Sequence, residues 1–173
     1  MSEPVERVFD AVADAAPEIR GGLPERRATA ESENESGEVQ LEADVWADDL
    51  LFDRVEAIEG VNWYASEERE DVMTVGDADD GYAVALDPLD GSSNVKSNNP
   101  CGTVVGVYDQ PLPAPGSSLV AAGFVLYGPT TTMVVARDGE ATEYLVDDDG
   151  RTDLGPVELP EEPTVYGFGG RVP

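Results

Sequence analysis

Histidine is absent from this sequence of 173 residues, and lysine and cysteine occur once each, as Lys96 and Cys101. Without histidine, Ser-His and Cys-His nucleophilic catalysis are excluded. A single cysteine excludes an intrachain disulfide framework, and we expect Cys101 to be a small buried residue rather than a reactive thiol. The longest apolar run, Leu119 to Tyr127, is too short to span a bilayer, and the start MSEPVERV lacks the pattern of a signal peptide.

Basic residues are also scarce, because ten Lys and Arg stand against 37 Asp and Glu, for a formal net charge of −27. Such a surface repels itself in dilute buffer, and molar salt screens it because the Debye length at 1 M is about 3 Å. The apolar content of 40% still allows a core, so the acidity does not indicate disorder. We therefore predict a cytoplasmic protein of an extreme halophile that binds neither nucleic acid nor anionic membranes.

The periodicity of the apolar residues predicts an α/β (α+β layered) fold. Spacings of three and four residues predict helices over 3–20 and 39–58, separated by a polar loop over 23–37. The inner side of the second helix is predicted to carry Leu41, Val45, Leu50, Leu51, Val55 and Ile58. Shorter apolar runs predict strands that start near residue 82 and over 61–65, 103–108, 119–127, 131–136, 143–146 and 164–168. We expect the two helices to pack on a mixed, largely antiparallel sheet, with a hairpin turn at 147–150.

The stretch from Tyr82 to Asn94 joins a predicted strand to an acidic turn. A buried strand would deliver Asp87 and Asp90 into a turn that contains Pro88 and Gly91. The Gly-Ser-Ser-Asn that follows offers backbone N–H groups and hydroxyls suited to an anion. Hard oxygen ligands beside such a cradle are the chemistry of Mg²⁺-assisted phosphoryl transfer. An ordinary strand-to-loop turn would explain the same residues, so this stretch alone does not decide.

A second acidic pair, Glu67 and Glu68, directly follows the predicted strand over 61–65. If this strand neighbours the one before Asp87, four carboxylates converge at one edge of the sheet. Bound divalent cations would offset their mutual repulsion. Adjacent strand residues point to opposite faces, so Glu67 and Glu68 can both be ligands only if the chain bends there.

Together, Ser66-Glu67-Glu68, the run from Asp87 to Asn94, and the strand sequences over 102–108 and 119–128 resemble class I fructose-1,6-bisphosphatase, over roughly residues 5–170. The resemblance implies a phosphoric monoester hydrolase that removes the 1-phosphate of fructose 1,6-bisphosphate in gluconeogenesis. Two alternatives stay open. One is another phosphatase of the same superfamily, acting on inositol phosphate or a nucleotide bisphosphate; the other is a non-catalytic remnant that binds only metal or partners.

The resemblance also implies roles for individual residues. Two or more Mg²⁺ ions would be held by oxygen ligands of Glu67, Glu68, Asp87, Leu89 and Asp90. The 1-phosphate would be bound by the turn residues Asp90, Gly91, Ser92 and Ser93. The attacking water would be activated by Asp44, Glu68 and Glu38. Lys96 stands where the family carries an aspartate, and we expect it to be a solvated lysine rather than a phosphate ligand.

The family's sequence continues beyond the position of Pro173. The resemblance implies that its second half supplies the sugar-binding tyrosines, a phosphate-binding lysine, an arginine shared between subunits and a further metal-ligating glutamate. We therefore expect residues 1–173 to form an N-terminal metal- and phosphate-binding domain without the C-terminal substrate domain, and to turn over substrate inefficiently. The full-length form is expected to be a homo-oligomer.

Overall fold

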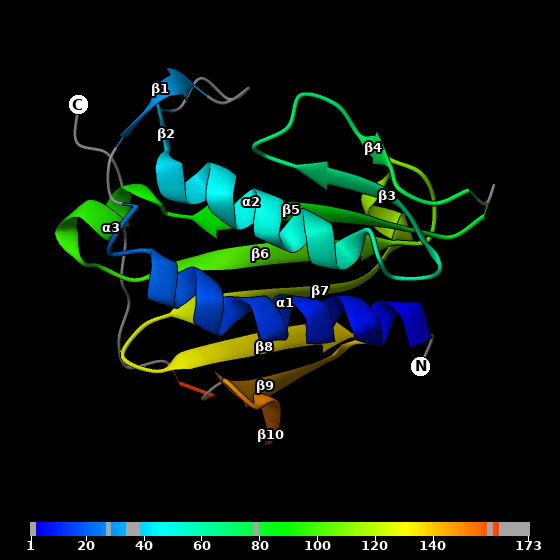
Figure 1. The fold of residues 1–173 in the computed structure, drawn as a ribbon. Coiled ribbons are helices and arrows are strands. Elements are labelled where there is room, and N and C mark those ends of the chain that lie inside the picture. Colours follow the sequence, from blue (N-terminus) through cyan, green and yellow to red (C-terminus); the bar gives the residue numbers. More distant parts are fainter. Residues whose placement is uncertain (1–2, 27–28, 34–38, 78–79, 159–160, 163–173) are drawn as a thin grey trace.

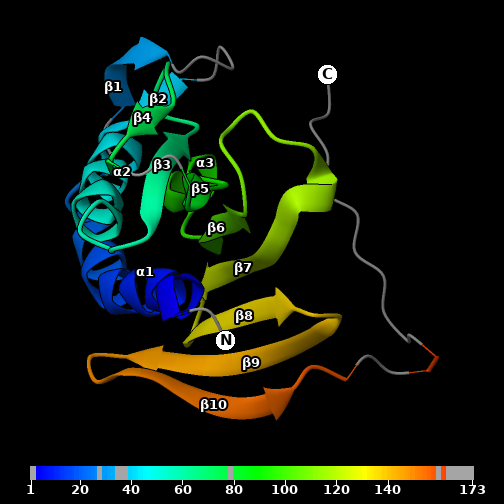
Figure 2. The ribbon, with the colours of Figure 1, turned by 90° about the vertical axis from the view of Figure 1, so that its right-hand side faces the viewer.

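Two long helices lie side by side on one face of an eight-stranded sheet (Figure 1). The structure is a computed structural model that describes residues 3–26, 29–33, 39–77, 80–158 and 161–162. The helices are α1 (Glu3–Gly22) and α2 (Glu42–Val55). Figure 2 shows the sheet from its edge, with both helices on the same side. The predicted layered α/β class is confirmed.

The sheet is an antiparallel meander with one parallel pair near its end. Its strand order is β10-β9-β8-β7-β6-β5-β3-β4. The meander consists of β5 (Tyr82–Asp90), β6 (Cys101–Tyr108), β7 (Leu119–Tyr127), β8 (Thr131–Arg137), β9 (Glu140–Asp147) and β10 (Gly150–Pro156). Strand β3 (Val61–Ser66) runs parallel to β5, and β4 (Met73–Thr74) pairs antiparallel with β3. The predicted strands over 61–65, 103–108, 119–127, 131–136 and 143–146 are confirmed, β10 was not predicted, and residues 164–168 lie outside the described residues.

The segment between the two helices differs from the prediction. Thr29–Glu33 forms β1, which pairs antiparallel with β2 (Val39–Leu41). Part of the predicted loop is therefore a strand, and α2 begins at Glu42 rather than at Val39. Helix α2 ends at Val55, and a turn follows that contains Gly60 at φ +93°, a conformation that favours glycine. Glu38 lies outside the described residues.

The core lies between the helices and the sheet, and the inner stripe of α2 is partly polar. Leu51 and Val55 are buried as predicted, but Val45 is 40% exposed. Asp44 and Asp48 take the inner positions instead and are each only 3% exposed. Residues three and four apart share one side of a helix, so positions 44, 48, 51 and 55 form one stripe. The prediction that Val45 lies on the inner side of the helix is wrong, because it considered only the spacing of apolar residues.

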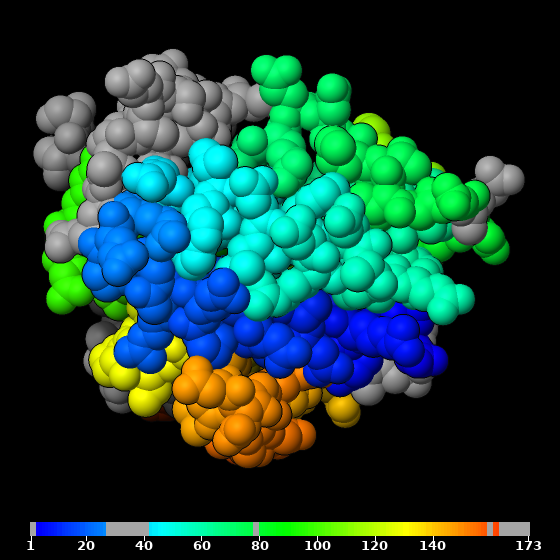
Figure 3. Space-filling model, in the orientation of Figure 1, coloured from blue at the N-terminus to red at the C-terminus, as the bar shows by residue number. Residues whose placement is uncertain are grey.

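The opposite face of the sheet carries neither of these helices (Figure 2). Val104, Phe124 and Leu126 are 42%, 44% and 41% exposed. Figure 3, in contrast, shows α1 and α2 as a continuous band of atoms across the middle of the first face. Among the described residues, no helix is long and apolar enough to cross a membrane. Within the described ranges, the sheet therefore has one face that the two helices cover and one open face with exposed apolar side chains.

Candidate metal and phosphate site

The two acidic pairs lie at the carboxyl ends of neighbouring strands. Strands β3 and β5 pair in parallel, with Ser66 opposite Leu86, so Glu67 and Asp87 occupy equivalent places at the ends of this pairing. The backbone N–H of Glu67 donates to the Leu86 carbonyl at 3.1 Å. The condition on which the predicted site depended, that the two strands are neighbours, is confirmed.

A β-bulge turns Asp87 and Asp90 toward the same face of the sheet. Asp87 lies opposite Val104 and Asp90 opposite Gly102, so three steps on β5 match two steps on β6. In a regular strand, residues three apart point to opposite faces, and the extra residue of a bulge re-aims the second side chain. Asp87 lines a hollow of about 350 Å³ and Asp90 one of about 630 Å³, and Val104 borders both. The bulge thus gathers the two carboxylates.

Buried hydroxyls hold the backbone between these aspartates. Thr103 donates to the Pro88 carbonyl at 2.8 Å, so its oxygen accepts from the Tyr127 hydroxyl at 2.8 Å. Both side chains are buried, and burial raises the pKa of Tyr127, which keeps its proton. The N–H of Leu89 donates to Asp87 Oδ1 at 3.1 Å. The core therefore fixes the path of the chain that carries the acidic groups.

The Asp87 carboxyl is strongly perturbed. Its pKa is raised from 3.8 to about 7, first by burial, then by the charge of Glu67 and a hydrogen bond with it, and then by the charge of Asp90. The N–H of Leu89 acts in the opposite direction. Glu67 and Asp90 thus both lie within electrostatic reach of Asp87. A carboxyl that keeps its proton near neutral pH between two others is a place where a divalent cation would displace the proton.

The oxygen donors of the acidic residues suit Mg²⁺, although their side chains do not surround a common point. In the part of the chain that the structure describes, no group of three or more Asp, Glu or Cys side chains is arranged so that it could hold a metal ion. Mg²⁺ prefers carboxylate, carbonyl and water oxygens, which Glu67, Asp87, Asp90 and the Leu89 carbonyl supply. Their role as metal ligands stays a prediction.

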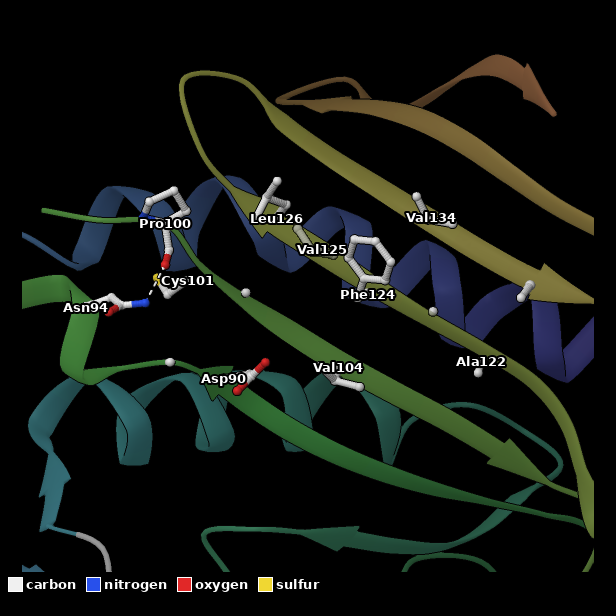
Figure 4. A pocket seen from close by; sticks show the side chains of 14 residues that line it. Asp90, Asn94, Pro100, Cys101, Val104, Ala122, Phe124, Val125, Leu126 and Val134 are labelled. Atoms are coloured by element: carbon white, nitrogen blue, oxygen red, sulfur yellow. Dashed lines mark hydrogen bonds between the residues drawn. The ribbon is translucent and has the colours of Figure 1, made fainter. Parts of the chain in front are cut away.

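The predicted phosphate-binding residues form the turn from β5 into the short helix α3 (Ser93–Ser97). Gly91 has φ +74°, and a Cβ there would come within 3.2 Å of Asn94 Nδ2. Ser92 makes no side-chain cap on α3, and Ser93 and Lys96 are exposed. Figure 4 shows Asn94 beside Cys101 at one end of the larger hollow, and Asp90 between Cys101 and Val104.

Asp44 approaches the site from α2. Burial, followed by the charges of Asp44 and Asp90, raises the pKa of the Cys101 thiol to about 11. Because both carboxylates raise the pKa of Cys101, the first residue of β6, Asp44 and Asp90 lie in the same region of the molecule. Cys101 is buried, as predicted, and its thiol stays protonated at neutral pH. Glu68 lies next to Glu67 in the turn after β3.

Two residues that adjoin the site, Asp48 and Arg69, were not predicted. Arg69 Nε donates to Asp48 Oδ2 at 2.6 Å, although the two residues come from α2 and from the turn after β3. The sequence contained two signals for this pair. Asp48 follows Asp44 by one helical turn, and Arg69 is one of only ten basic residues and directly follows the acidic pair.

Known proteins are similar to this chain over most of its length. The family model "Fructose-1-6-bisphosphatase, N-terminal domain" matches residues 18–154. A class 1 fructose-1,6-bisphosphatase of Halobacterium salinarum is 78% identical over 174 residues, which cover 100% of this chain and 61% of that relative. One of Natronomonas pharaonis is 54% identical and covers 100% of this chain and 62% of that relative.

A solved structure supports the fold independently. The fructose-1,6-bisphosphatase of Leishmania major in its holo form superimposes with a TM-score of 0.83 at 20% identity, over 94% of this chain and 57% of that one. At this identity the similarity concerns the fold. The chain spans about 61% of the length of the Halobacterium salinarum relative that it matches.

Proposed function

Since the chain belongs to the fructose-1,6-bisphosphatase family, we propose that it takes part in the Mg²⁺-dependent hydrolysis of the 1-phosphate of fructose 1,6-bisphosphate. The observation that carries this proposal is the effect of Glu67 and Asp90 on the Asp87 carboxyl where β3 and β5 pair, beside the turn that begins at Gly91. The names of the haloarchaeal relatives support the choice of substrate.

The acidic residues would hold two or more Mg²⁺ ions. Carboxylates of Glu67, Glu68, Asp87 and Asp90 and the carbonyl of Leu89 would provide the ligands. When bound, Mg²⁺ would neutralise the phosphate charge and lower the pKa of the attacking water. Asp87 would lose the proton that its neighbours now make it retain, because a cation favours the ionised carboxylate.

The turn over residues 90–93 would bind the 1-phosphate. Gly91 allows the substrate to approach the backbone closely, and the hydroxyls of Ser92 and Ser93 would donate to phosphate oxygens. Helix α3 has only five residues, so these hydroxyls and N–H groups, rather than a helix dipole, would carry the interaction.

Asp44 and Glu68, with Glu38, would orient the attacking water and accept its proton. Asp44 is buried on α2, which supports a role on the side of the site that is shielded from solvent. In-line attack requires the water and the leaving sugar oxygen on opposite sides of the phosphorus. Groups from α2 would hold the water on the side of the phosphorus away from the sugar, while the 90–93 turn would hold the phosphate oxygens in place.

The net charge of the chain and the organisms of its relatives support a proposal for where the protein acts and what it does not bind. A net charge of −27 supports the cytoplasm of an extreme halophile and opposes binding to nucleic acid or anionic membranes. The two relatives described above come from haloarchaea, in agreement with this assignment. The protein would act as a homo-oligomer.

A phosphate-release assay in molar KCl tests the proposal. The chain should release phosphate from fructose 1,6-bisphosphate only with Mg²⁺. Asp87→Asn should lower the rate by more than about 100-fold, since even outer partners of metal ligands cost 10–100-fold. Asp109→Asn, which makes the same charge change at an exposed position, serves as the control.

Two results would contradict the proposal. Faster release from inositol 1-phosphate would favour another phosphatase of the superfamily. Metal binding without any phosphate release would favour a non-catalytic role.

A further inference from the structure

We propose that Asp48 and Arg69 form a clamp that positions Glu67 and Glu68 against α2, and that this clamp determines how tightly the acidic turn binds a divalent cation. The identity of the site rests on the proposed function. The clamp itself is a set of contacts between described residues, and metal binding can be measured without catalysis.

The acidic pair occupies the middle of a tight turn that is anchored at both ends. The N–H of Arg69 donates to the Ser66 carbonyl at 3.2 Å, and the N–H of Glu68 donates to Ser66 Oγ at 3.2 Å. At the first end, the N–H of Glu67 donates to the Leu86 carbonyl of β5 at 3.1 Å. The second end is held through the side chain of Arg69.

Arg69 reaches α2 through both charge and ring contacts. Its Nε is 2.6 Å from Asp48 Oδ2, its Nη2 is 3.0 Å from Asp49 Oδ1, and its guanidinium lies 4.3 Å from the centre of the Phe52 ring. The Asp49 side chain is 68% exposed, so its ion pair contributes little. The Asp48 side chain is only 4% exposed, and a short ionic hydrogen bond to a buried carboxylate restricts the arginine strongly.

Asp48 is itself fixed, because both of its oxygens are engaged. The Tyr64 hydroxyl donates to Asp48 Oδ1 at 2.8 Å, while Oδ2 accepts from Arg69. Burial raises the pKa of Tyr64, and the charge of Asp48 and the hydrogen bond to it raise it further, so the phenol remains a donor. Tyr64 belongs to β3, the strand that leads into the acidic turn. The clamp therefore ties α2 both to β3 and to the turn that follows it.

The same contacts relate the acidic turn to Asp44. Asp44 precedes Asp48 by one helical turn on the buried side of α2, and both are 3% exposed. When Asp48 and Arg69 hold α2 in register with the turn, they also fix the position of Asp44 relative to Glu67 and Glu68. The ion pair between Asp48 and Arg69 thus fixes the relative positions of three proposed site residues. These are Asp44 on α2 and Glu67 and Glu68 in the turn after β3.

The positive charge of Arg69 and its positioning role should change the Kd for a cation in opposite directions, so the two effects can be separated. A positive charge near carboxylates repels a cation, so removal of this charge alone would tighten cation binding. Loss of the positioning would weaken binding, because the ligands would have to be ordered when the cation binds. The direction of the change in Kd therefore distinguishes a clamp from a simple electrostatic neighbour.

The test is a Mn²⁺ titration in molar KCl, with free Mn²⁺ followed by electron paramagnetic resonance. Arg69→Met should raise the Kd by about tenfold or more, as for other outer partners of metal ligands, and Arg69→Lys should raise it less. Asp48→Asn should also raise the Kd.

Arg151→Met is the matched control. Arg151 pairs with Asp10 at 2.9 Å and with Glu6, and it lies 4.7 Å from the Tyr144 ring, but it belongs to β10 at the far edge of the sheet. This substitution should destabilise the fold and leave the Mn²⁺ Kd unchanged.

An unchanged or lower Kd in Arg69→Met overturns the proposal, and so does a wild-type chain that binds no Mn²⁺. If near-ultraviolet circular dichroism shows that Arg69→Met does not fold, Arg69→Lys and Asp48→Asn decide by the same criterion. The proposed function fails differently. In that case the wild-type chain binds Mn²⁺ and depends on the clamp, yet releases no phosphate from the sugar bisphosphate.

Discussion

Replacing Asp87 with asparagine should make the metal-free protein more stable at pH 8. The raised pKa means that the folded chain binds a proton at Asp87 more tightly than the unfolded chain does. The resulting stability is fully present below the ordinary pKa of 3.8 and is lost as the pH rises through about 7. The asparagine side chain would be neutral at every pH and, like protonated Asp87, could donate to Glu67 and accept from Leu89.

The size of the effect follows from the change in pKa. The difference between 3.8 and about 7 corresponds to about 4 kcal/mol at 1.36 kcal/mol per pKa unit. This is an upper value, because Asp87 is only partly buried and Asp90 is exposed, so solvent screens their repulsion. We therefore expect the Asp87→Asn variant to exceed the wild type by about 1–3 kcal/mol above pH 7, and to match it near pH 4.

The assay is denaturant unfolding in molar KCl with a chelator, from pH 4 to pH 8.5. Asp109→Asn controls for the loss of one charge at an exposed position. Adding Mg²⁺ at pH 8 should then stabilise the wild type and leave Asp87→Asn unchanged, because the variant lacks a carboxylate ligand. A stability difference that does not vary with pH, or a variant less stable than the wild type at pH 8, would refute the electrostatic reasoning.

Salt, core packing and thiol chemistry give further tests. The chain carries 37 acidic and only ten basic residues, and salt screens the repulsion among the acidic ones. The unfolding temperature should therefore rise steeply from dilute buffer to molar KCl, and equal stability would contradict the halophilic assignment. Phe9→Ala should cost about 3–5 kcal/mol in chemical unfolding because Phe9 is 1% exposed, whereas Phe124→Ala, at a 44% exposed position, should cost less than about 1 kcal/mol. Equal losses would contradict the open face of the sheet. Folded Cys101, with a pKa of about 11, should react with a thiol reagent at pH 8 about 100-fold more slowly than in the unfolded chain, and equal rates would contradict its burial.

The sheet was largely predictable, because its central strands bury one face and carry apolar residues in recognisable runs. Asp138 and Gly139, both at positive φ, form the two-residue turn between β8 and β9, and this residue pair is typical of such turns. Strand β10, with the sequence GRTDLGP, has no apolar alternation, and it forms through its pairing with β9. The polar strand β1 likewise depends on its partner β2. Partners of this kind are tertiary information that a local pattern does not contain.

From the residues alone, the candidate site was predictable where acidic residues follow strands and not where they lie inside a helix; Asp44 in α2 was named only through the family resemblance. Glu67 was placed correctly after β3 and Asp90 at the end of β5, because the strand pattern located them. The prediction that Asp87 and Pro88 belong to the turn is wrong, because β5 continues through them to Asp90.

Asp48 was missed because a buried aspartate is acceptable only with partners such as Arg69, which lies 21 residues further along the chain. Such a pair becomes visible only when α2 is packed against β3.

The function proposed for this chain depends on divalent cations held by the carboxylates around Asp87. Anomalous diffraction from crystals grown in molar salt and soaked with Mn²⁺ tests this dependence most directly. We predict one or more peaks within about 2.2 Å of oxygens of Glu67, Asp87 and Asp90, close to the usual distance for such ligands, and no peak there in Asp87→Asn. Peaks elsewhere on the acidic surface, with none at the ends of β3 and β5, would contradict the metal assignment.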